Sequence, residues 1–63
     1  MTTIEKAIEA AYESQITSLY KALSQSILAA NGDEAEISAA EARFKKGLAF
    51  AADIKARALT AAQ

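Results

Sequence analysis

Three glutamates spaced four residues apart, Glu5, Glu9 and Glu13, are the first side chains in this chain whose types and spacing could do chemistry. A ladder of carboxylates on one helix face can bind a hard cation, or transfer protons where the carboxylates are buried against one another. The sequence favours neither role, because the ladder flanks a polar helix face and the chain has no His, which bundle-type metal sites require. We expect a solvated surface that pairs with basic residues.

Other catalytic patterns are missing from the sequence. The chain has no Cys and no His, and it contains neither a Gly-rich phosphate loop nor a nucleophile beside a base. Tyr12 and Tyr20 are interpreted as packing residues whose hydroxyl groups reach water. The prediction is a protein that is not an enzyme and that binds no cofactor and no metal.

A second pattern is typical of binding rather than catalysis. Arg43, Lys46, Phe50, Asp53 and Arg57 step by three and four residues, so on a helix they form a line about 20 Å long. Arg and aromatic side chains are enriched at binding hot spots. We call Arg43, Lys46, Phe50 and Arg57 the basic stripe and predict that it binds another protein. The alternative is that Phe50 packs at a dimer seam beneath the stems of its basic neighbours.

Two further interpretations of the basic stripe stay open. RNA would need several phosphate contacts, and a dimer would double the stripe. The net charge of −1 and the pI near 5.2 make non-specific attraction to nucleic acid weak, so RNA ranks below a protein partner. A purely structural dimer without a separate ligand is the remaining alternative.

The elements that must position these residues are helices. Seventeen Ala, two Gly and no Pro among 63 residues predict an all-α chain. Apolar residues recur every three or four positions in the first half, which is the period of an amphipathic helix. This stripe contains Ile4, Ile8, Tyr12, Ile16, Leu19, Leu23 and Ile27.

Capping signals set the predicted helix ends. Thr2 with Glu5, and Asp33 with Glu36, are spaced as capping boxes at helix starts. Asn31 and Gly32 are the residue types that best tolerate the left-handed conformation that ends a helix. The sequence therefore predicts one domain over 1–63, with helices at about 3–30 and 34–61 joined by a turn at 31–33.

Charge placement predicts how the two helices pack. So short a turn makes them antiparallel. Residues 1–41 carry two Lys and seven acidic residues, whereas 42–63 carry five basic residues and Asp53. Folding back brings opposite charges together, and a turn centred near Gly32 places Glu9 near Lys55.

The second helix has a wider apolar face than one neighbouring helix needs. It spans about 140° of the wheel, against about 100° for an ordinary surface helix. A chain this short also has a marginal core and no Cys for a disulfide. We therefore predict a homodimer of hairpins, a four-helix bundle. The predicted interface contains Ile37, Ala40, Phe44, Gly47, Leu48, Ala51 and Ile54.

The sequence offers no membrane segment. Its N-terminal residues are acidic where a signal peptide would be basic and then apolar, and no stretch approaches eighteen uncharged apolar residues. We expect a cytoplasmic protein without a membrane partner.

A short, Pro-free hairpin whose helices pair with those of a second copy resembles the Rop family of plasmid copy-number regulators, which are RNA-binding four-helix dimers. The resemblance implies the architecture only. The RNA site of that family lies on the first helix and uses basic, amide and aromatic side chains, whereas the first helix here offers only Lys6 and Lys21 as basic residues. The Ala-rich stretch from Ala40 to Ala62 also resembles small phage and prophage accessory proteins.

Overall fold

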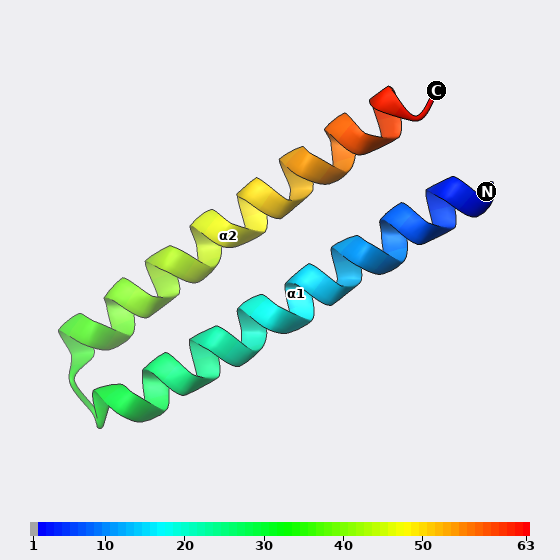
Figure 1. Cartoon of the computed structure of the whole chain (residues 1–63). Helices are drawn as coiled ribbons and strands as arrows, with labels where there is room; N and C mark the ends of the chain where they lie inside the picture. The colour runs from blue at the N-terminus through cyan, green and yellow to red at the C-terminus, as the bar shows by residue number, and fades with distance from the viewer. Residues whose placement is uncertain (1) are drawn as a thin grey trace.

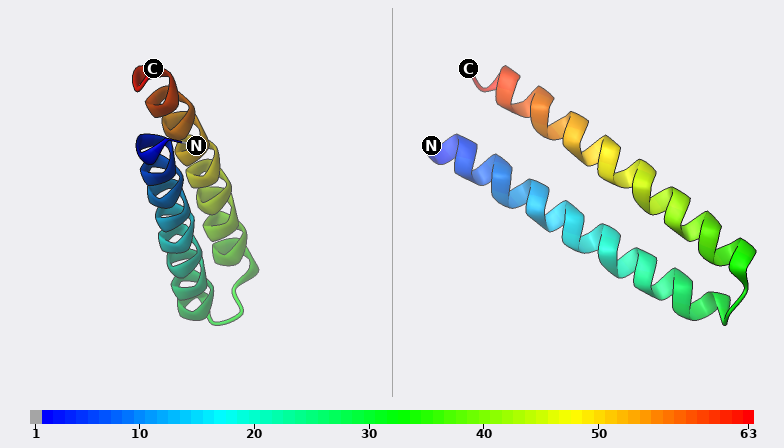
Figure 2. Two further views of the ribbon diagram at one scale, coloured as in Figure 1. Left: turned by 90° about the vertical axis from the view of Figure 1, so that its right-hand side faces the viewer. Right: turned by 180° about the vertical axis from the view of Figure 1, so that it is seen from behind.

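Two long helices lie side by side and run in opposite directions (Figures 1 and 2). The structure is a computed structural model that describes residues 2–63. Helix α1 spans Thr3–Ala30 and helix α2 spans Glu34–Ala61. The Cα atoms occupy 46 × 15 × 11 Å, so the hairpin is a single layer of two helices. The predicted all-α hairpin is confirmed.

The turn between the helices uses the residues that the sequence indicated. Asn31 has φ 50° and ψ 45°, and Gly32 has φ 86°, so both adopt the left-handed conformation that ends a helix. The Asp33 carboxylate then accepts hydrogen bonds from the backbone N–H groups of Ala35 and Glu36, at 3.0 and 3.2 Å. These bonds satisfy two of the N–H groups that have no partner inside α2.

Each of the two capping boxes forms only the half in which the capping side chain accepts from a backbone N–H group. A full box would have the Glu36 side chain accept from the Asp33 backbone N–H. That N–H instead donates to the carbonyl oxygen of Ala30, at 3.0 Å, and so closes the end of α1. At the start of α1, Thr2 accepts from the Glu5 N–H, and its hydroxyl donates to the Glu5 carboxylate, both at 3.1 Å.

The contact between the helices is built on small residues. In the described part of the chain only Ala30, Ala40 and Ala51 are buried, and the larger apolar side chains are half-buried or exposed. The hairpin exposes 4797 Å², whereas a compact monomer of its mass of 6.6 kDa exposes about 3,900 Å². The excess of about 900 Å² reflects the elongated shape of a two-helix layer, and several large apolar side chains, among them Ile4, Tyr20 and Leu28, are exposed on it.

The hairpin has two long sides, which differ in side-chain size. On the side that we call the Phe50 flank, the helices present small residues around Phe50, among them Ser14, Ser18 and Gly47. Leu48 lies about 160° from Phe50 at 100° per residue, so it belongs to the opposite side, which we call the Leu48 flank. The Leu48 flank contains Ile16, Tyr20, Ile27, Ile37, Leu48, Lys55 and Leu59.

Candidate docking surface

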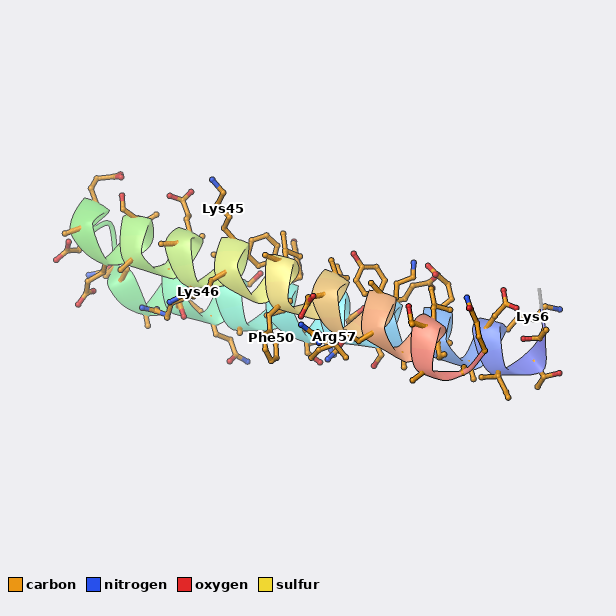
Figure 3. The ribbon with its side chains drawn as sticks, turned by 90° about the horizontal axis from the view of Figure 1, so that it is seen from above. Lys6, Lys45, Lys46, Phe50 and Arg57 are labelled. Atoms are coloured by element: carbon orange, nitrogen blue, oxygen red, sulfur yellow. The ribbon has the colours of Figure 1, made fainter. Side chains whose placement is uncertain are left out.

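The structure places the basic stripe on the Phe50 flank and on the outer side of α2. Figure 3 shows Lys46, Phe50 and Arg57 on one side of α2 and Lys45 on the opposite side. Helical spacing of three and four residues produces this alignment. Phe50 is 66% exposed, so in a single hairpin its ring is in contact with solvent.

The charges of the basic stripe are not equivalent. The Arg57 Nε donates to the Asp53 carboxylate at 2.9 Å, one helical turn away. Both side chains are well exposed, so this pair contributes little stability, about 0 to 1 kcal/mol. Within residues 2–63 neither ion pair includes Arg43 or Lys46. Counted together with Asp53, the basic stripe carries a net charge of +2.

A hollow of about 330 Å³ lies beside Phe50, between the two helices. It exists because the residues around it are small. Its lining comes from Ser14, Gln15, Ser18 and Leu19 of α1 and from Gly47, Phe50 and Ala51 of α2. The hollow continues the basic stripe inward, and it presents hydroxyl and amide groups beside apolar surface.

The residues predicted for the dimer interface fall into two groups. Ala40 and Ala51 are only 3% and 2% exposed, because α1 covers them, and little of their surface remains for a second copy. Gly47 also faces α1, since a Cβ atom there would lie 2.5 Å from Leu19 Cδ2. Ile37, Phe44 and Leu48 are half-buried, and Ile54 is exposed. The dimer role of the set stays a prediction.

The glutamate ladder pairs with α2 at one position. The Glu9 carboxylate contacts Lys55 Nζ at 2.5 Å, as the predicted register requires. The same ammonium lies 4.7 Å from the centre of the Tyr12 ring, which is cation–π distance. The hydrogen bond to Glu9 raises the pKa of Lys55 above its usual 10.5. Among residues 2–63 no cluster of three or more acidic, His or Cys residues could hold a metal ion.

Two contacts of the site were not predicted from the sequence. Leu19 packs onto Gly47, and Ser14, Gln15 and Ser18 line the hollow beside Phe50. The register contains a signal for the first contact, because Leu19 and Gly47 lie almost level when Glu9 faces Lys55. The hollow has no comparable signal, since it depends on which part of each helix face turns toward the other helix.

The structure and the comparisons define the architecture of this protein and assign it to no family. No described helix is long and apolar enough to cross a membrane. Comparison with models of known families, with curated protein sequences and with solved structures found no match. The resemblance to Rop therefore rests on the hairpin alone, and a phage or prophage origin stays a prediction.

Proposed function

We propose that this chain is a small, non-enzymatic adaptor or regulatory protein of the cytoplasm, which acts as a homodimer and binds an acidic protein partner through the basic stripe. The observation that carries the proposal is the exposure of Phe50, which is 66% exposed on the same side of α2 as Lys46 and Arg57. An exposed aromatic side chain flanked by basic residues is the composition of a binding hot spot.

Charge supports a partner with an acidic face. Arg43 and Lys46 take part in neither ion pair of residues 2–63, so their charges are available to a ligand. Asp53 neutralises part of the Arg57 charge, which limits the attraction that a bare phosphate backbone would feel. A protein partner needs only a few carboxylates opposite the stripe, together with an apolar residue for Phe50 and its hollow.

Surface area supports self-association into a four-helix bundle. The excess exposure of about 900 Å² is close to the roughly 800 Å² that each partner buries in a stable protein interface. We expect a dimer whose melting temperature rises with protein concentration, because only the folded state associates. A well-folded monomer at micromolar concentration in sedimentation would exclude it.

The proposed partner role is tested by affinity capture from the source cell, followed by titration of the captured partner. Phe50→Ala and the double reversal Arg43→Glu with Arg57→Glu should each lower partner affinity at least about tenfold while helix content stays. The matched control reverses Lys6 and Lys21, which changes the net charge equally on the outer face of α1. Equal binding by all variants would exclude the basic stripe as the docking site.

The same capture separates the alternatives. Recovery that is lost after nuclease treatment would favour an RNA-binding regulator of the Rop kind. A parent protein that self-associates and binds nothing at micromolar concentrations would favour a purely structural dimer.

A further inference from the structure

The Leu48 flank has the features of a surface that pairs with itself. It carries four large apolar residues that one hairpin leaves half-buried, Ile16, Ile37, Leu48 and Leu59, and Tyr20 on it is 64% exposed. The hairpin exposes about 900 Å² more than a compact chain of its mass. A two-fold dimer that covers this area would be of standard interface size.

The sequence of this flank along α2 is symmetric about Leu48. In an antiparallel pair of identical helices, residues equally distant from the two-fold axis face one another. Positions 41 and 55 lie seven residues to either side of Leu48, and positions 37 and 59 lie eleven to either side. With the axis at Leu48, the facing pairs are Ile37 with Leu59, Glu41 with Lys55, Phe44 with Ala52, and Leu48 with itself.

Each of these pairs is chemically complementary. Ile37 faces the Leu59 of a second copy, so two apolar side chains meet near each end of the interface. Phe44 faces an Ala, which leaves room for its ring. Glu41 faces a Lys55, and it has no ion-pair partner of its own within residues 2–63. The Lys55 ammonium has three N–H donors, so it can bind this carboxylate in addition to Glu9.

Helix α1 contributes one matching pair about a point at the same level. Glu9 and Lys55, which are in contact, have numbers that sum to 64, and so do Ile16 and Leu48. An axis level with Leu48 therefore passes Ile16, where it places Tyr12 opposite the Tyr20 of a second copy. Aromatic pairs of this kind stabilise interfaces beyond the area that they bury. The same axis sets Glu9 opposite Leu23 and Glu5 opposite Ile27, so the complementary pairs lie mainly on α2.

We propose that a second copy of this chain covers the Leu48 flank in an antiparallel arrangement, with the two-fold axis level with Ile16 and Leu48 and with the turns at opposite ends. This proposal rests on the proposed self-association and fixes its geometry. The Phe50 flanks of the two copies then lie on opposite outer faces of the bundle. The dimer presents two separate basic stripes, each complete within one chain.

The competing arrangement places both turns at the same end. Its axis runs along the bundle, so α2 of one copy packs against α1 of the other, and the two Leu48 residues lie diagonally apart. A disulfide requires Cα atoms about 4.4–6.8 Å apart. Position 48 therefore distinguishes the arrangements, because only the antiparallel one brings it beside its own copy.

The test uses single cysteines, since the natural chain has none. Under mild oxidation Leu48→Cys should form covalent dimers at least about tenfold faster than Phe50→Cys, which lies on the opposite flank of the same helix and reports collisional cross-linking. As a check that needs no core substitution, Glu41→Lys should weaken dimerisation about tenfold, because two attractive pairs become repulsive. Glu36→Lys makes the same charge change near the Phe50 flank, and it should leave the dissociation constant of the dimer unchanged.

The outcomes separate this proposal from the one on which it rests. If the parent sediments as a dimer but Leu48→Cys cross-links no faster than Phe50→Cys, the antiparallel axis is wrong and self-association stands. If Glu41→Lys and Glu36→Lys dimerise as tightly as the parent, the Leu48 flank is not the interface. A monomeric parent at micromolar concentration would overturn the dimer itself. The partner-capture experiment with the basic-stripe variants is independent of all these results.

Discussion

The two flanks of the hairpin contain residues from the same two helices, yet they differ in what their side chains do. On the Leu48 flank, Ile16, Ile37 and Leu48 are half-buried, Tyr20 is 64% exposed, and Lys55 is held by Glu9 and Tyr12. On the Phe50 flank, small residues leave a hollow of about 330 Å³, and one aromatic ring projects into solvent. Side-chain volume and polarity together therefore distinguish a side with large apolar residues along its length from a side where Phe50 projects among small and polar residues.

The two phenylalanines give the largest expected contrast between the flanks. Phe44 is half-buried and lies only about 40° from Leu48 on α2, and Phe44→Ala should lower the free energy of unfolding by about 2 to 3 kcal/mol. Phe50→Ala removes the same atoms from an exposed position, so it should cost less than about 1 kcal/mol. Urea unfolding at one protein concentration measures both. Equal losses would mean that Phe50 is buried at a seam, as the alternative interpretation holds.

Gly47 tests whether the contact between the two helices is as tight as the structure indicates. A Cβ atom at Gly47 would lie 2.5 Å from Leu19 Cδ2, so any larger side chain must displace Leu19. Gly47→Leu should destabilise the protein by about 1 to 2 kcal/mol through overpacking, although Leu is the better helix former. Gly47→Ala should be milder, because the end of a Leu side chain can move. A higher melting temperature for Gly47→Leu with the same oligomeric state would show that the close contact does not exist.

The turn and the register of the hairpin were predictable because each depends on local chemistry or on charge. Asn31 and Gly32 end α1 for conformational reasons, and the opposite charges of Glu9 and Lys55 set the alignment. The alignment of Lys46, Phe50 and Arg57 followed from helical spacing alone.

The division into two flanks was not predictable in the same way. A helical wheel gives the angle of each residue, but it does not say which part of a wide apolar arc the neighbouring helix occupies. Ala40, Gly47 and Ala51 were therefore grouped with Leu48 as dimer residues, although α1 covers them within one hairpin. The hollow beside Phe50 also depends on the rotation of α1, which no residue of α2 determines.

Asp33 provides a reference that belongs to neither flank. Its carboxylate accepts from two backbone N–H groups at the start of α2, so Asp33→Ala should lower the free energy of unfolding by about 1 kcal/mol. Asp33→Asn keeps a capping oxygen, so it should lower the free energy of unfolding by only a few tenths of a kcal/mol. Thermal or urea unfolding of the two Asp33 variants gives a reference change in stability against which the changes in the flank variants can be compared. A neutral Asp33→Ala would show that helix packing alone holds the turn.

The smallest expected effect is a pH dependence that arises on the Leu48 flank. The hydrogen bond to Glu9 raises the pKa of Lys55 above 10.5 in the folded protein. Because the pKa of Lys55 is higher in the folded than in the unfolded protein, the pair with Glu9 contributes its full stabilisation below the pKa that Lys55 has in the unfolded chain. This stabilisation is lost as the pH rises through the pKa that Lys55 has in the folded protein. The free energy of unfolding should therefore fall as the pH rises above about 10.5, the ordinary pKa of Lys. Lys55→Gln removes this contribution, whereas Lys46→Gln removes a lysine from the outer side of α2. The parent and Lys46→Gln should lose stability more steeply than Lys55→Gln, and parallel curves for all three would show that the ion pair with Glu9 does not stabilise the hairpin.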